Sequence, residues 1–211
     1  MKYVSSGTEL YCIRGEPVPA KEGQFVIIPK NTEYSAHGYD SVTKGICIDL
    51  TDKVIENEAF CSRLPLNTPI DCYGLSGIGK LMYPIQSRNA RTSGSLDKNR
   101  LSFESFLKSI TESVITLGVD IELVVAALAK DVRKQNTRMN IALKLLHVRD
   151  FIRARYFEKI SLCRLEMISG LSKHHLTRLF KASFGKTPRA YLEETRMRVA
   201  RKMVLEQLSL K

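Results

Sequence analysis

The segment ISLCRLEMISGLSKHHLTRLFKASFGKTP, residues 160–188, predicts two helices joined by Ser169-Gly170-Leu171. Glycine permits the tight, left-handed backbone turn that such a junction needs. The second helix is expected to begin after Ser172, a favourable N-cap residue, and to end at Gly185. The first helix has one apolar stripe, formed at three-residue intervals by Leu162, Leu165 and Ile168.

The predicted second helix is amphipathic, because successive residues follow one another at about 100° around a helix. Its apolar side carries Leu176, Leu179, Phe180 and Ser183, and its polar side carries His174, Thr177, Arg178 and Lys181. Two short helices joined by a three-residue turn with Gly, the second with a polar and basic face, form the helix-turn-helix pattern. In that pattern the second helix lies in the major groove of DNA. An amphipathic helical hairpin without a DNA-binding role is the alternative interpretation.

A longer stretch, GLSKHHLTRLFKASFGKTPRAYLEETRMRVARKMV, residues 170–204, resembles the first helix-turn-helix and the linker helix of AraC/XylS-type transcription regulators. The family pattern runs G-x-S-x-x-x-L-x-R-x-F-K, then F-G-x-x-P, then Y-L, then R and A at helical spacing. The matching residues are Gly170, Ser172, Leu176, Arg178, Phe180, Lys181, Phe184, Gly185, Pro188, Tyr191, Arg196 and Ala200. The resemblance implies a sequence-specific transcription regulator whose partner is double-stranded DNA.

The resemblance also implies roles for individual side chains. The positions that read bases in the family match His174, Thr177 and Arg178, which also lie on the polar side of the predicted helix. Phosphate contacts are expected from the helix N-terminus after Ser161 and from Lys173, Lys181 and Arg189.

Positive charge is concentrated in the same part of the chain. Residues 131–211 contain 19 Lys and Arg against 7 Asp and Glu, whereas residues 1–130 contain 14 against 15, so the C-terminal part accounts for the whole net charge of +11. A basic domain beside a neutral one is expected for a nucleic-acid binder with a separate regulatory module. Membrane surfaces also attract basic segments. Here the basic residues alternate with a periodic apolar pattern that a folded domain would bury, which favours nucleic acid.

The sequence predicts an α+β protein with three parts: a regulatory and dimerisation domain at 1–130, a linker at 131–139, and an all-α helix-turn-helix domain at 140–211. The segment Arg133–Arg138 is charged and has no periodicity, which is typical of a linker. A helix is expected over Asn140–Tyr156, with an inward face formed by Ile141, Leu145, Val148 and Ile152. Thr187-Pro188 predicts the start of a last helix, with an inward face formed by Tyr191, Leu192, Ala200, Met203 and Val204.

Closely spaced turn residues in the N-terminal part predict an antiparallel meander or a small antiparallel β-barrel rather than a parallel sheet. Strands are expected at Glu9–Arg14, Phe25–Ile28, Glu33–Ala36 and Val42–Leu50. The stretch EGQFVIIPKNTEYSAHG, residues 22–38, resembles part of the cupin-like sensing barrels of AraC-type regulators. An unknown small-molecule effector is therefore a candidate partner, and candidate lining residues are Tyr11, Tyr34 and Tyr39, which would otherwise be core residues.

Two helical stripes follow the predicted barrel. They consist of Phe103, Phe106, Leu107, Ile110 and Val114, and of Ile121, Val124, Val125 and Leu128, with Gly118 between them. This pattern predicts an antiparallel helical hairpin. In AraC-type regulators such a pair commonly serves dimerisation, so a homodimer through residues 101–130 is expected, with packing against the barrel as the alternative. An apparent helix at Asp52–Leu64, a flexible loop at Ser76–Lys80 and a polar stretch at Ser87–Asp97 complete this part.

No enzyme, cofactor or metal site is predicted. His37 and Tyr34 have no H-x-H motif beside them, so a ligand set cannot be assembled. No carboxylate pair or nucleophile with a base stands at a spacing that would support catalysis. Five scattered cysteines without a C-x-x-C pair indicate reduced thiols, and no apolar run is long enough for a signal core or a membrane span, so a cytoplasmic location is expected.

The chain departs from the family pattern in two ways. Leu208–Lys211 resembles the opening of the family's second helix-turn-helix unit, most of which is expected to be missing. The barrel strands that the family usually has upstream of Met1 are expected either to be absent or to be replaced by a barrel that is built differently. Glu166 stands where the family usually has a small residue, and a desolvated carboxylate would need a partner such as Arg164 or Lys159. These departures support an alternative function: a truncated interaction protein that dimerises with or antagonises a full-length regulator without specific DNA binding of its own.

Overall fold

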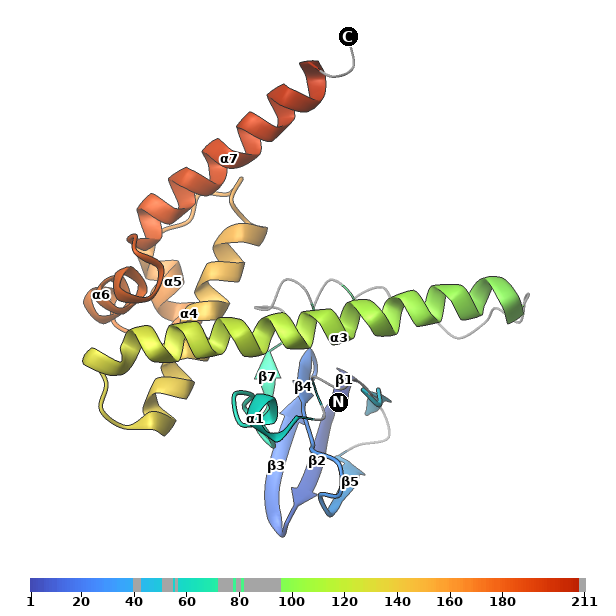
Figure 1. Ribbon diagram of the computed structural model, residues 1–211. Coiled ribbons are helices and arrows are strands. Elements are labelled where there is room, and N and C mark those ends of the chain that lie inside the picture. Colours follow the sequence, from blue (N-terminus) through green and yellow to red (C-terminus); the bar gives the residue numbers. More distant parts are fainter. Residues whose placement is uncertain are drawn as a thin grey trace. The chain divides into compact units, whose positions relative to one another are not determined.

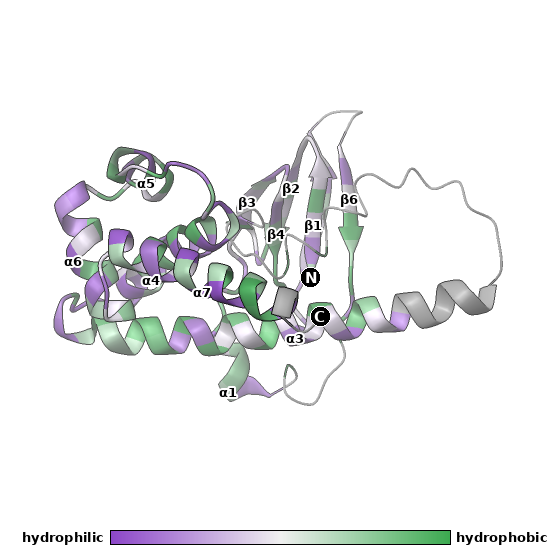
Figure 2. Cartoon of the chain, turned by 90° about the horizontal axis from the view of Figure 1, so that it is seen from above, coloured by the Kyte–Doolittle hydropathy of each residue, from purple (hydrophilic) through white to green (hydrophobic). Residues whose placement is uncertain are grey.

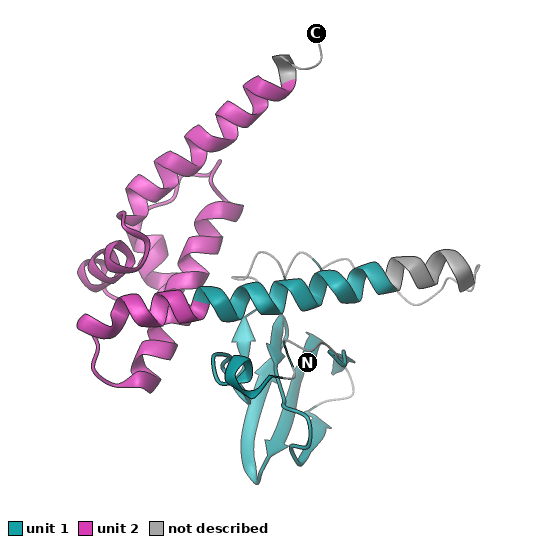
Figure 3. Cartoon of the chain, in the orientation of Figure 1, with its two compact units in different colours: residues 1–120 teal, residues 121–211 magenta. Residues whose placement is uncertain are grey.

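The computed structural model shows an α+β protein (Figure 1). It describes residues 1–39, 43–50, 55, 57–71, 78, 81 and 96–208. In the helix that begins at residue 96, side chains are described from residue 104 onward, and in the last helix they are described up to residue 206. Most of the predicted loop at Ser76–Lys80, most of the polar stretch at Ser87–Asp97 and part of the predicted helix at Asp52–Leu64 lie outside the described residues. The chain divides into two compact units, Met1–Asp120 and Ile121–Lys211 (Figure 3).

The N-terminal unit contains two small antiparallel sheets. One has the strand order β6-β1-β4-β7, formed by Lys44–Cys47, Lys2–Ser6, Gln24–Val26 and Ile70–Asp71. The other has the order β3-β2-β5, formed by Glu16–Lys21, Thr8–Ile13 and Tyr34–Gly38. Strands β2, β4, β5 and β6 correspond in position to the predicted strands, although each begins and ends at other residues than predicted. The predictions were Glu9–Arg14, Phe25–Ile28, Glu33–Ala36 and Val42–Leu50.

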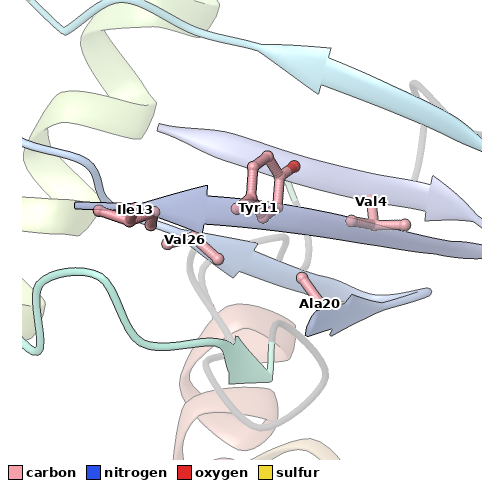
Figure 4. Close-up of a cluster of buried hydrophobic side chains, with 5 residues drawn as sticks. All are labelled: Val4, Tyr11, Ile13, Ala20 and Val26. Carbon is pink, nitrogen blue, oxygen red and sulfur yellow. The ribbon is translucent and has the colours of Figure 1, made fainter. Parts of the chain in front are cut away.

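Both sheets contribute to one apolar core (Figure 4). Its buried members are Val4 from β1, Tyr11 and Ile13 from β2, Ala20 from β3 and Val26 from β4. Each of these side chains is at most 3% exposed. In β2 the buried residues Tyr11 and Ile13 stand two positions apart, as expected for a strand with one buried face.

Strands β1, β3 and β7 were not among the predicted strands, and β3 contains two prolines, Pro17 and Pro19. Proline lacks a backbone N–H and is confined largely to edge strands within sheets. β3 is an edge strand, and its two prolines stand opposite Cys12 and Leu10 of β2. They therefore occupy alternate positions on an edge strand, and they also discourage pairing of that edge with another chain.

The N-terminal unit also contains α1 (Glu58–Cys61) and most of α3 (Leu96–Ala127). The predicted helical hairpin is wrong, because α3 continues through Gly118 as a single helix. A Cβ at Gly118 would lie 2.8 Å from two ring carbons of Phe60. Glycine is needed here for close packing against α1 rather than for a chain reversal. Buried residues recur along α3 at Ile110, Val114, Leu117, Ile121 and Val124.

The C-terminal unit is entirely helical. It contains the end of α3 followed by η1 (Leu128–Lys130), α4 (Gln135–Ala154), α5 (Leu162–Ser169), α6 (Lys173–Phe184) and α7 (Pro188–Leu208). The predicted inward face of α4 is confirmed, with exposures of 7% or less for Ile141, Leu145, Val148 and Ile152. The helix begins at Gln135 rather than Asn140, so part of the predicted linker segment is helical.

Helix α7 packs against α4 and α6. Leu192, near its beginning, is buried as predicted. The predicted inward positions of Met203 and Val204 are wrong, since both side chains are 55% exposed, and Ala200 is exposed too. The apolar spacing of α7 continues beyond the part of the helix that neighbouring helices cover.

Candidate nucleic-acid interface

The junction between α5 and α6 has the local structure that its sequence predicts. Gly170 ends α5 in the left-handed conformation, with φ 62° and ψ 23°. The Ser169 hydroxyl donates to the Leu165 carbonyl at 2.8 Å and accepts the Leu171 N–H at 3.2 Å. Ser172 then caps α6 by accepting the His175 N–H at 3.4 Å. These hydrogen bonds end α5 at Gly170 and start α6 after Ser172.

The inner face of α6 is firmly anchored. Leu176, Leu179 and Phe180 have no exposed surface, and burial of each contributes about 1.5–3 kcal/mol. The centroid of the Phe180 ring lies 4.5 Å from that of the Phe184 ring and 5.6 Å from that of the Tyr191 ring of α7. Helix α6 is thus held from behind by a continuous apolar and aromatic contact.

The exposed residues of α6 are mostly polar. Hydrophilic and hydrophobic colours both occur along this helix (Figure 2). His174 is exposed and Thr177 is half-buried. The Thr177 hydroxyl donates to the Lys173 carbonyl at 2.8 Å, within its own helix. The donor of the Thr177 hydroxyl is therefore used within α6, and its oxygen can still accept a hydrogen bond.

Arg178 is also on the outer face, but it already has a partner. Its Nη1 atom lies 2.7 Å from Oδ1 of Asp131, which follows η1. The Arg178 side chain is 51% exposed, whereas the Asp131 side chain is 24% exposed. The sequence alone does not indicate this ion pair, because the two partners are 47 residues apart and nothing in the local pattern connects them.

Lys173 likewise lies beside a carboxylate. Its Nζ atom is 3.9 Å from Oε2 of Glu166, on α5. A hydrogen bond with Cys163 and, more weakly, the Glu166 carboxylate raise the pKa of Lys173 above its ordinary value. The expected partners of Glu166 were wrong: Arg164 pairs with Glu158 instead, so it is Lys173 that compensates the unusual carboxylate of α5.

The remaining predicted phosphate contacts are accessible. Lys181 is exposed and forms no ion pair within the ranges that the structure describes. Arg189, in the first turn of α7, is 86% exposed and pairs at 3.2 Å with Glu193 one turn later. The Ser161 hydroxyl caps α5 by accepting the Arg164 N–H at 3.2 Å. All three positions belong to the C-terminal unit, on α6, on α7 and before α5.

A second network, which sequence analysis did not identify, fixes the loop before α5. Glu158 accepts hydrogen bonds from Nη1 of Arg155 at 2.6 Å and from Nη1 of Arg164 at 2.8 Å. These two guanidinium groups lower the pKa of the Glu158 carboxyl below its ordinary value. Arg196 of α7 donates to the carbonyls of Tyr156 and Glu158, at 2.8 Å each. The loop therefore presents Ser161 in a defined position.

In the N-terminal unit, the three candidate effector-lining tyrosines do not share one environment. Tyr11 is buried and donates to Oε2 of Glu9 at 2.6 Å; burial and this carboxylate raise the pKa of Tyr11 well above its ordinary value. Tyr34 lies partly exposed beneath the Lys2 ammonium, and Tyr39 is 71% exposed. His37 is exposed on β5.

Among the described residues, no three His, Cys, Asp or Glu side chains gather closely enough to hold a metal ion. None of the helices in the described ranges combines the length and apolar character required to cross a bilayer. No family model, curated protein or solved structure matches this chain.

Proposed function

We propose that the C-terminal unit is a helix-turn-helix module and that the protein is a sequence-specific, DNA-binding transcription regulator of the AraC/XylS type. In this proposal α5 is the first helix of the module and α6 is the recognition helix, which enters the major groove. His174, Thr177 and Arg178 contact bases. Lys173, Lys181, Arg189 and the N-terminus of α5 beside Ser161 contact phosphates.

The amphipathic division of α6 is the observation that carries this proposal. Leu176, Leu179 and Phe180 are fully buried, whereas Lys173, His174, Arg178 and Lys181 are exposed. A helix held from behind in this way can present its outer side chains to a groove without losing its own packing. Helix α6 contains no Asp or Glu, so its own residues add no repulsion toward phosphates.

Charge supports the same assignment. The C-terminal part, residues 131–211, has 19 Lys and Arg against 7 Asp and Glu. Phosphate neutralisation by such residues supplies most of the nonspecific affinity for DNA. The N-terminal unit, with its neutral charge balance and two antiparallel sheets around one core, suits a separate regulatory role.

Dimerisation through residues 101–130 remains part of the proposal, but it has little apolar surface available. The stripe of α3 that would mediate it is largely buried within the chain, including Ile110, Val114 and Leu117. Val119 and Leu123, which are 43% and 64% exposed, are the large apolar residues of α3 that remain accessible among the described side chains.

Selection of bound duplexes from a random pool, followed by titration of two variants, tests the proposed function. We expect Arg178→Ala to weaken binding to the selected duplex by roughly 1–3 kcal/mol, because it removes a bidentate base contact, and to affect a shuffled duplex less. Lys181→Ala, which removes an equally cationic side chain from the same helix, should weaken binding to both duplexes alike. Salt-sensitive binding without sequence preference would instead favour an interaction protein without specific DNA binding of its own. Equal losses for Arg178→Ala on both duplexes would refute the base-reading role.

A further inference from the structure

The Arg178–Asp131 ion pair occupies only one part of the guanidinium group. The single contact joins Nη1 to Oδ1 at 2.7 Å, and Nε and Nη2 have no partner among the described residues. An arginine guanidinium has five N–H donors in a rigid plane. Asp131 therefore holds one corner of the group and leaves the adjacent Nε–Nη2 edge available, with two parallel donors.

Asp131 is well placed to hold this orientation because its own backbone is fixed. Its N–H donates to the Leu128 carbonyl at 3.0 Å, and Leu128 has no exposed surface. The short helix η1 packs against both α4 and α6. The carboxylate is thus supported by the core of the C-terminal unit, whereas the arginine side chain that it contacts is half-exposed.

The free Nε–Nη2 edge matches the chemistry of one base. Guanine presents O6 and N7 as two adjacent acceptors in the major groove, and arginine reads them with two parallel N–H donors. A phosphate that approached Nη1 would instead meet the negative charge of Asp131. The same carboxylate consequently favours a guanine edge and disfavours the DNA backbone as the partner of Arg178.

We propose that Asp131 is a specificity-determining residue of the DNA interface: it positions Arg178 for guanine and reduces binding to phosphates at random sequences. This inference rests on the proposed function of α6. Asp131 acts through Arg178 rather than through its own contact with DNA. It connects η1, which directly follows α3, with the recognition helix of the same unit.

The test compares Asp131→Asn with Glu206→Gln, using the full chain with a duplex selected by the wild-type protein and a shuffled duplex of equal length. Both substitutions are nearly isosteric and remove one negative charge, but Glu206 pairs with Lys202 on the last turns of α7. An exposed ion pair is worth about 1.4- to 5-fold in an equilibrium constant. We expect Asp131→Asn to bind the shuffled duplex about 3-fold more tightly and the selected duplex about 3-fold more weakly, which lowers the ratio of affinities about 10-fold.

Two further readouts separate positioning from simple charge removal. Asp131→Asn should steepen the dependence of shuffled-duplex binding on salt by about one ion, because Arg178 becomes free to meet a phosphate. In the Arg178→Ala background, Asp131→Asn should no longer change the ratio of affinities. Glu206→Gln should leave that ratio unchanged in every background.

The inference is overturned if Asp131→Asn changes both affinities in the same proportion, as expected for Glu206→Gln, or if its effect on the ratio persists in the Arg178→Ala background. That outcome leaves the proposed function intact, because the wild-type protein would still discriminate between the two duplexes. Failure of the wild-type protein and all variants to bind either duplex would overturn the proposed function, and this inference with it.

Discussion

Gly170 provides a quantitative test of the turn that positions α6. A Cβ at this position would meet only Nζ of Lys144, at 3.8 Å, so an alanine has room and its cost lies in the backbone. The left-handed conformation costs an L-residue about 1–2 kcal/mol. Reduced freedom of the unfolded chain offsets about 0.4–1 kcal/mol of this cost. We therefore expect Gly170→Ala to lower the free energy of unfolding by roughly 1 kcal/mol.

Urea unfolding followed by far-UV circular dichroism measures this change. Gly170→Asn is the informative companion, since asparagine tolerates the left-handed region and should cost less than alanine despite its larger side chain. Gly185, with φ +73° and no atom within 4 Å of a built Cβ, should respond to alanine in the same way as Gly170. Two results would show that left-handed backbone strain does not control the turn. One is a Gly170→Ala variant as stable as the wild-type protein, and the other is a greater loss of unfolding free energy for Gly170→Asn than for Gly170→Ala.

Two other stability predictions concern packing and pH. Gly118→Ala should lower the free energy of unfolding by roughly 1–3 kcal/mol, because its Cβ would lie 2.8 Å from the Phe60 ring. Adding Phe60→Leu to this variant should restore part of the lost stability. A gain in stability for Gly118→Ala, as expected in a helix without such a neighbour, would refute the close contact. Glu158 has a lowered pKa beside Arg155 and Arg164, so its contribution is fully present above its unfolded pKa of about 4.3 and is lost as pH falls through the lower folded value. Wild-type protein should therefore be more stable than Glu158→Gln at neutral pH and approach it in acid, whereas a pH-independent difference in urea unfolding would contradict the role of this carboxylate.

The parts of the fold that depend on local chemistry could be predicted from the sequence. The limits of α6 follow from Ser172 and Gly185, and its buried face follows from residue spacing, so that Leu176, Leu179 and Phe180 were identified correctly. Such signals act within one or two helical turns. They need no knowledge of the rest of the chain.

The errors arose where a distant residue decides the outcome. Gly118 resembles a helix break until Phe60, far away in the sequence, is placed beside it. β3 resembles turn sequence until β2 pairs with it at the edge of a sheet. Val204 has the spacing of a core residue, but spacing does not say whether a neighbouring helix extends far enough to cover it.

The same distinction applies to the candidate interface. Sequence spacing placed Arg178 and Lys181 on one outward face of α6, and both side chains are exposed. It could not show that Arg178 pairs with Asp131, which follows η1, while Lys181 forms no ion pair among the described residues. Arg178 and Lys181 lie on the same face of α6, but only Arg178 would bind DNA while it is paired with a carboxylate from the described part of the same chain.

The energies of the ion pair and of the DNA contacts indicate different roles for Arg178 and Lys181 in the proposed interface. An exposed ion pair such as Arg178–Asp131 is worth about 0.2–1 kcal/mol, a small energy that nevertheless rivals the gain from a single screened phosphate contact. A bidentate contact with guanine is worth about 1–3 kcal/mol, and it uses donors that Asp131 leaves free. Arg178 consequently gains little from phosphates and more from a matching base. Lys181, which has no intramolecular ion pair to exchange within the described part of the chain, gains from any phosphate within its reach.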